Sequence, residues 1–242
     1  MAELQRFSID DLVTFSSDIR AAGSDATTMV EAACAVTRYL YDNLRAADGA
    51  PACALVRVFK THLFDHLPPE RQETARQVAP DVRPETPCMT LLSSNGDPNR
   101  PEPGVPAEWV LPFTEQSFRT IPLIPQILTE IGLDLESAVD PDRALDVRVR
   151  HQRFNVFLEG DLSNSALLPE PSHRERVAQI GMRSLAVVGG ILPSGELLLV
   201  MWYGLEEIPA RVADLFRSLG LAIEAALIPF TYSVFEPGRR RR

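Results

Sequence analysis

The chain has 242 residues, of which 45% are hydrophobic and 24% charged, an ordinary globular composition with enough apolar residues for one large core. The formal net charge is −9 although four arginines stand together at 239–242. A body this acidic repels phosphate backbones, which argues against nucleic acid as its partner. The longest apolar run, at 197–203, is far shorter than the roughly 20 residues that span a bilayer. The N-terminus shows no signal peptide, so we expect a cytoplasmic protein without membrane association.

Two helices are predicted at the start of the chain. Ser8 with Asp11, and Thr28 with Glu31, have the spacing of capping boxes, in which side chains satisfy the free N–H groups of a helix start. Further helices are predicted at 69–78, 125–133, 172–180 and 209–227, and strands at 52–59, 88–93, 154–158, 184–188 and 196–203. The segments 94–116, which is rich in proline, and 161–171 are interpreted as loops.

The order of these elements favours an α/β (α+β) fold with a central, mostly antiparallel sheet flanked by helices. The strand at 196–203 is almost wholly apolar, which predicts a central place in the sheet with helices on both of its faces. No internal repeat and no dividing linker is visible, so one domain is expected.

Several segments resemble, in their order along the chain, the closing half of a GAF domain. They are Ile-Gly-Met-Arg-Ser at 180–184, Gly-Glu-Leu at 195–197 and the final helix at 209–227. Matching segments of the GAF-like subgroup found at the N-terminus of bacterial sensor histidine kinases are 38–44, 52–61, 121–123, 155–157 and 189–195. The chain departs from that subgroup at 161–166, where the relatives carry a Gly-Ser-Pro-Tyr-like stretch, so any ligand contact made there is in doubt.

The resemblance implies a sensory or regulatory domain rather than an enzyme. It implies an N-terminal helix at 1–25, a GAF-like sensor domain at 26–235 and a basic tail at 236–242. It also implies binding of a small molecule, homodimerisation through the first and last helices, and a histidine kinase or other signalling protein of a two-component system as partner. An interaction module that binds no ligand is the alternative.

Four residues are candidate ligand contacts, because each is predicted near a strand end or loop that would border a GAF pocket: Lys60, His62, Trp109 and His173. The simpler interpretation is surface polarity, or for Trp109 a side chain that holds the proline-rich loop to the core. We expect the cover of the pocket to come mainly from 94–116 and 161–171. His62 and His66 lack the glutamate of a zinc hydrolase motif, so no metal site is expected.

The cysteines are Cys34, Cys53 and Cys88, and their apolar surroundings predict buried, free thiols. None is followed by histidine, which argues against a covalently bound bilin, and no cofactor is predicted. A third function class stays open, a thiol-dependent reductase, because Cys53 and Cys88 lie on two predicted strands and could meet. The arginines at 239–242 could bind acidic lipid or nucleic acid, but a solvated tail explains them.

Overall fold

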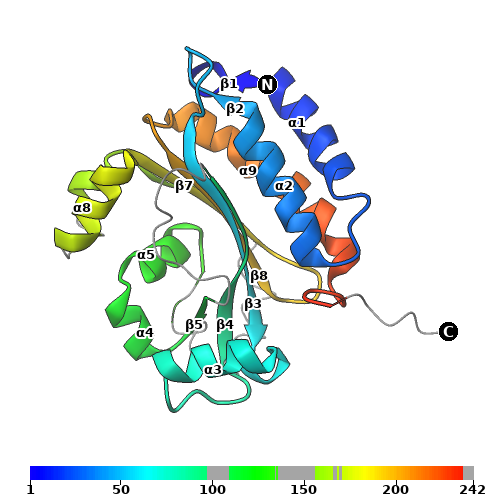
Figure 1. The fold of residues 1–242 in the computed structure, drawn as a ribbon, viewed down its shortest axis with the longest axis vertical. Helices are drawn as coiled ribbons and strands as arrows, with labels where there is room; N and C mark the ends of the chain where they lie inside the picture. The colour runs from blue at the N-terminus through cyan, green and yellow to red at the C-terminus, as the bar shows by residue number, and fades with distance from the viewer. Residues whose placement is uncertain (97–108, 134, 136–155, 166–167, 169–170, 237–242) are drawn as a thin grey trace.

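The computed structural model describes residues 1–96, 109–133, 135, 156–165, 168 and 171–236. Its centre is a six-stranded antiparallel sheet in the order β5-β4-β3-β8-β7-β6 (Figure 1). The strands of this sheet are β3 (Cys53–Leu63), β4 (Pro87–Gly96), β5 (Val110–Pro112), β6 (Phe157–Glu159), β7 (Ser184–Ile191) and β8 (Leu197–Gly204). A short parallel pair, β1 (Ala2–Glu3) with β2 (Leu44–Arg45), lies outside it.

Helices cover both faces of this sheet, as predicted. The α-helices are α1 (Ile9–Ala22), α2 (Met29–Asn43), α3 (Pro69–Val78), α4 (Glu115–Thr120), α5 (Leu123–Glu130), α8 (Pro171–Ile180) and α9 (Ala210–Leu227). Short 3-10 helices are η1 (Leu4–Arg6), η2 (Phe64–His66), η3 (Leu162–Asn164) and η4 (Ile228–Phe230). Helices α1, α2 and α9 lie together on one face, and α4 and α5 lie on the other (Figure 1). We call these the α9 face and the α5 face.

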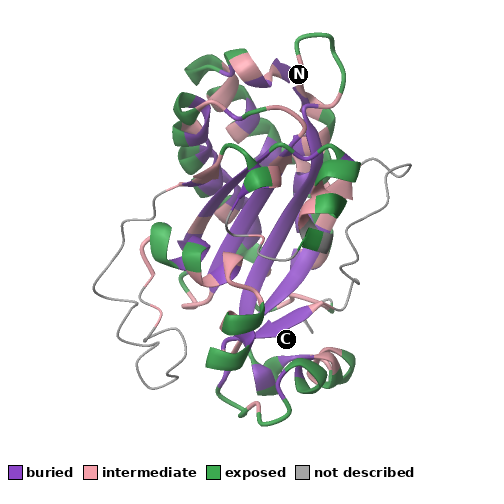
Figure 2. Cartoon of the chain, turned by 90° about the vertical axis from the view of Figure 1, so that its left-hand side faces the viewer, coloured by how far each residue is buried: buried purple, intermediate pink, exposed green. Residues whose placement is uncertain are grey.

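The side chains of β8 alternate between two hydrophobic clusters, because successive residues of a strand point to opposite faces. Leu198 and Trp202 belong to the cluster under α9, whereas Leu199 and Met201 belong to the cluster under α5. Figure 2 shows the strands buried in the middle and the outer sides of the helices exposed. The predicted α/β architecture and the central place of this strand are therefore confirmed.

Both predicted capping boxes are present. The Ser8 hydroxyl accepts from the backbone N–H of Asp11, and the carboxylate of Asp11 accepts from the backbone N–H of Ser8. Thr28 and Glu31 form the same reciprocal pair at the start of α2. These boxes fix where the two helices begin.

Three predictions need correction. The interval 94–116 is not a loop throughout, because it contains β5 and the start of α4, while residues 97–108 lie outside the described part. The helix predicted from residue 172 begins one residue earlier, at Pro171, because proline is tolerated in the first turn of a helix. Cys34 is exposed, because its position in α2 faces away from the sheet. In the described part of the chain, no helix is long and apolar enough to cross a membrane.

Candidate functional site

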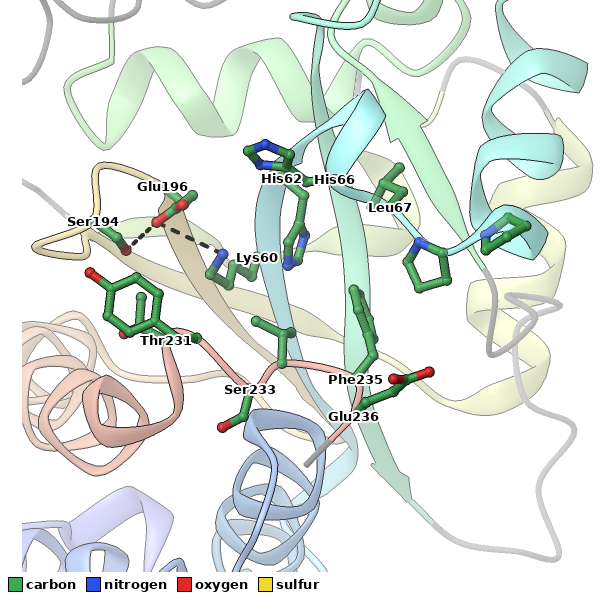
Figure 3. A pocket seen from close by; sticks show the side chains of 14 residues that line it. Lys60, His62, His66, Leu67, Ser194, Glu196, Thr231, Ser233, Phe235 and Glu236 are labelled. Atoms are coloured by element: carbon green, nitrogen blue, oxygen red, sulfur yellow. Dashed lines mark hydrogen bonds and ion pairs between the residues drawn. The ribbon is translucent and has the colours of Figure 1, made fainter. Parts of the chain in front are cut away.

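A cavity of about 530 Å³ lies on the α9 face of the sheet, at the end of β3 (Figure 3). Three segments far apart in sequence form it: the end of β3 with η2, the hairpin between β7 and β8, and the chain after α9. Its lining residues are Lys60, His62, His66, Leu67, Pro68, Pro69, Ser194, Glu196 and residues 231–236. We call residues 231–236 the C-terminal segment.

Lys60 points from β3 into this cavity beside Glu196 (Figure 3). It pairs with Leu198 of β8, and its side chain is only 2% exposed. The ammonium donates to the carbonyl oxygen of Thr61 at 3.2 Å and lies 3.8 Å from Oε2 of Glu196. Burial lowers the pKa of Lys60 to about 8, and the Glu196 carboxylate acts in the opposite direction. This amine therefore gives up its proton more readily than a lysine in water does.

His62 follows two residues later on the same face of β3 and is also buried, at 7% exposure. The hydroxyl of Thr90 donates to the carbonyl oxygen of Lys60 at 3.0 Å, so it accepts from Nδ1–H of His62, also at 3.0 Å. Nε2 is then an acceptor, and it has no hydrogen-bond partner among the described residues. Burial, with Lys60 and Arg71 as nearby cations, lowers the pKa of His62 well below its usual value, so the ring is neutral.

The hairpin between β7 and β8 supplies the carboxylate of the site. Gly195 has φ of +94°, a conformation that favours glycine, and its N–H donates to the carbonyl oxygen of Leu192 at 2.7 Å. This tight turn places Ser194 beside Glu196, and the serine hydroxyl donates to the carboxylate. The oxygen that accepts from the serine, Oε2, is also the one that faces Lys60.

The C-terminal segment closes the cavity from the α9 side and is held by α2. The carbonyl oxygens of Ser233 and Val234 accept from the N–H groups of Met29 and Val30 at 2.9 and 3.1 Å. The ring of Phe235 lies against the imidazole of His62, with 5.2 Å between ring centroids. The guanidinium of Arg71 lies 4.6 Å from the centroid of the same phenylalanine ring. The wall of the cavity and the cap of a helix are thus one segment.

The structure brings together two of the four predicted ligand residues. Lys60 and His62 line the cavity, whereas Trp109 packs on the α5 face, with its ring centroid 5.4 Å from that of Phe59. His173 lies in α8, and its side chain is outside the described residues. The described lining residues include none from 94–116 or 161–171, the segments expected to cover the pocket. Among the described residues, the C-terminal segment covers the cavity.

Sequence reasoning missed Glu196 and the C-terminal segment. The available signal was strand pairing: Glu196 stands two residues before Leu198, the partner of Lys60, so it belongs to the same face of the sheet. Ser194 stands in a Pro-Ser-Gly turn, and its hydroxyl donates to the Glu196 carboxylate. No sequence pattern points to residues 231–236, because their position depends on where α9 ends relative to α2.

The cysteines cannot form the thiol cluster that a reductase needs. Cys53 pairs with Gly204 at one end of β3, and Cys88 pairs with His62 near the other end. Nine residue steps of strand, at about 3.3 Å each, separate the two sites by roughly 30 Å. Burial raises the pKa of both thiols to about 12. The reductase hypothesis is therefore wrong for this pair.

In the described part of the chain, no cluster of three or more His, Cys, Asp or Glu side chains could hold a metal ion. His62 and His66 both line the cavity, but His62 is buried on β3 and His66 is exposed on η2. What the cavity offers is a cation, a carboxylate and a neutral imidazole acceptor, which together suit a small polar molecule.

Solved structures with a similar fold include GAF domains. A phycocyanobilin-bound GAF domain from a cyanobacterial phytochrome is similar over 91% of this chain and 96% of that one, with 11% identity and a TM-score of 0.49. The blue-light absorbing form of the PixJ GAF domain of Thermosynechococcus elongatus is similar over 91% of this chain and 90% of that one, with 13% identity and a TM-score of 0.40. The N-acylhomoserine-lactone-dependent LuxR-family transcription factor CepR2 of Burkholderia cenocepacia is similar over 90% of this chain and 96% of that one, with 14% identity and a TM-score of 0.44.

No protein-family model matches the chain, and no curated protein matches it in sequence. At identities and TM-scores this low, the likenesses concern the fold and assign no role to any residue of this chain. The narrower resemblance to the sensors of histidine kinases stays a prediction.

Proposed function

We propose that this chain is a sensory domain that binds a small polar molecule in the cavity between Lys60, His62 and the C-terminal segment. The observation that carries the proposal is the incomplete pairing of two buried polar side chains on one cavity. Among the described residues, the buried ammonium has one hydrogen bond and the buried imidazole nitrogen has none. Both groups cost stability unless another group satisfies them. A ligand that binds both would recover that free energy.

The position of the C-terminal segment supports a route for the signal. This segment follows α9 and η4 directly, and it touches the cavity through Phe235 and α2 through its carbonyl oxygens. A ligand that displaces Phe235 from His62 would also change the cap of α2. Binding would therefore alter both the end of the chain and the helix layer, and a ligand can shift such an equilibrium only by its differential affinity for the two arrangements.

The test is a thermal-shift screen of the full chain against phenols, amino acids, cyclic nucleotides, haem and inorganic anions. A compound that binds only the folded state at 100 times its Kd stabilises that state by about 2.7 kcal/mol. We expect this stabilisation to disappear in His62→Leu and to persist in Trp109→Phe, a matched control on the α5 face. Stabilisation lost in Trp109→Phe and kept in His62→Leu would place the ligand on the wrong side of the sheet for this proposal.

A second measurement follows the segment itself. Tyr232 is 95% exposed, and chymotrypsin cleaves after tyrosine and phenylalanine, so cleavage after Tyr232 and Phe235 reports the mobility of the C-terminal segment. A ligand that occupies the cavity should change the cleavage rate at both positions. An unchanged rate with a stabilising compound would contradict signal transfer through this segment.

We extend the proposal to a homodimer and to a histidine kinase, or another protein of a two-component system, as the recipient of the signal. The support for the dimer is apolar exposure on two helices that pack together: Ile9 and Val13 of α1 and Leu221 of α9 are each more than 60% exposed. Light scattering of Val13→Glu and Leu221→Glu is the test, and a wild type that stays monomeric at high concentration would refute the dimer.

A further inference from the structure

The chemistry of the cavity does not match a simple anion, although a lysine lines it. The Lys60 ammonium already faces the Glu196 carboxylate at 3.8 Å, and the nearby His62 is a neutral ring whose free nitrogen accepts. An anion without hydrogens would meet a carboxylate and a lone pair, with the ammonium alone in its favour. A matched ligand brings a hydrogen-bond donor for His62 and a group that reacts or pairs with Lys60 without adding negative charge.

Lys60 has the features of a nucleophilic amine. It is the only lysine in the chain, and it is almost fully buried. Among the described residues, its ammonium makes one hydrogen bond, to the carbonyl oxygen of Thr61. Its lowered pKa makes the neutral amine accessible near neutral pH. The Glu196 carboxylate is close enough to receive the ammonium proton after a small side-chain movement.

We propose that this cavity captures a small hydroxylated aldehyde as an imine on Nζ of Lys60. This inference rests on the proposed function, in which the same cavity takes a small molecule. Nζ attacks the aldehyde carbon and forms a C–N bond, and the carbonyl oxygen takes up a proton. That oxygen then leaves as water, which carries one hydrogen of the neutral amine and the proton returned by Glu196. A C=N bond remains, and its nitrogen keeps the second amine hydrogen. The reaction needs no oxidant or reductant, and hydrolysis reverses it.

The neighbouring residues have distinct roles in this capture. Glu196 accepts the ammonium proton and returns it to the departing hydroxyl, and afterwards it is the counter-ion of the protonated imine. Nε2 of His62, an acceptor without a hydrogen-bond partner among the described residues, accepts a hydrogen bond from the hydroxyl of the aldehyde. Leu67, Val234 and Phe235 give the cavity an apolar side against which an aromatic ring can pack. Aromatic aldehydes with a hydroxyl group are therefore the class that fits.

The experiment uses 4-hydroxybenzaldehyde with the full chain, followed by borohydride reduction and mass spectrometry. Reduction turns the imine into a stable secondary amine, and peptide mapping separates Lys60 from the other amine, the N-terminus at Met1. We expect one hydroxybenzyl group per chain on Lys60, at an aldehyde concentration about tenfold lower than the N-terminus requires. Equal modification of the two amines, or modification of the N-terminus alone, would overturn the proposal.

Matched compounds and variants resolve the parts of the site. Benzaldehyde lacks the hydroxyl and should need about tenfold more compound for half-modification, and His62→Leu should remove that difference. Glu196→Gln should slow adduct formation about tenfold at pH 7.5. Equal half-modification of the wild type by both aldehydes would overturn the role of His62. Each variant is checked for folding by circular dichroism, and Lys60→Arg shows the background from the N-terminus.

A compound without the carbonyl separates the covalent step from binding. 4-Hydroxybenzyl alcohol should stabilise the wild type without any reducible adduct. If the alcohol stabilises the chain but the aldehyde leaves no adduct on Lys60, covalent capture is refuted while the binding function stands. If both compounds leave the melting temperature and Lys60 unchanged, this proposal is refuted, and the wider thermal-shift screen alone decides the binding function.

Discussion

Gly189 of β7 and Leu199 of β8 are cross-strand partners whose packing can be tested as a pair. A Cβ atom added at Gly189 would lie 2.6 Å from Cδ2 of Leu199 and 3.1 Å from Cδ1 of Ile131. Leu199 itself is fully buried in the cluster on the α5 face. The leucine side chain therefore occupies the space that a side chain at position 189 would need.

Magnitudes follow from this geometry. Leu199→Ala removes a fully buried leucine side chain and should cost about 2–5 kcal/mol of unfolding free energy. Gly189→Ala overpacks the same spot and should cost about 1–3 kcal/mol. In the double variant the new methyl group enters the space that the leucine has left. Its unfolding free energy should therefore be close to that of Leu199→Ala alone, which amounts to a favourable coupling of about 1–3 kcal/mol.

The assay is equilibrium unfolding in urea, followed by far-ultraviolet circular dichroism, for the wild type and the three variants. Equal m-values across the set would show that the unfolded states are comparable. If the two single changes add within about 0.5 kcal/mol, the two side-chain positions do not share a space, and this account of the sheet packing is refuted.

Three further predictions concern ionisable groups. Burial lowers the pKa of Lys60 from 10.5, the value of an ordinary lysine, to about 8 in the folded chain. The unfolding free energy of the wild type relative to Lys60→Met, measured in urea titrations, should therefore rise by up to about 3 kcal/mol between pH 7 and pH 10. A difference that stays constant with pH would contradict the buried amine. Burial raises the pKa of Glu224 to about 7, so stability should fall as pH rises from 4.5 through 7, and Glu224→Gln should flatten this dependence; an unaltered slope would count against it. Titration with a thiol reagent should find one fast cysteine, Cys34, while Cys53 and Cys88 react only on unfolding; a second fast thiol would refute their burial.

Much of the fold could be predicted from local signals. Capping boxes placed the starts of α1 and α2, and the apolar run of β8 placed that strand inside the sheet. Local signals failed where tertiary contacts decide the structure. β5 is three residues long, and it forms because Met89 and its neighbours in β4 offer an edge to pair with. Likewise, β3 extends to Leu63, past its apolar part, because β4 pairs with it there.

The site could be predicted only in part, for a related reason. Lys60 and His62 could be predicted as ligand contacts because they are polar residues at the end of an apolar strand, and both line the cavity. Their neighbour Glu196 is more than 130 residues away in sequence, and only the pairing register of β3 with β8 brings it near. Trp109 is predicted as a ligand contact from its place in the proline-rich segment, and that place does not reveal which face of the sheet the side chain will cover.

The bonds between the C-terminal segment and α2 have a kinetic consequence. They join residues about 200 positions apart, so loop closure delays them in folding, and we expect them to form late. The remaining N–H groups of the first turn of α2 bind Thr28, so the helix itself survives when the segment detaches. The amide hydrogens of Met29 and Val30 would then exchange with solvent at the rate of that detachment alone. Their exchange rate would therefore measure how often the cavity opens.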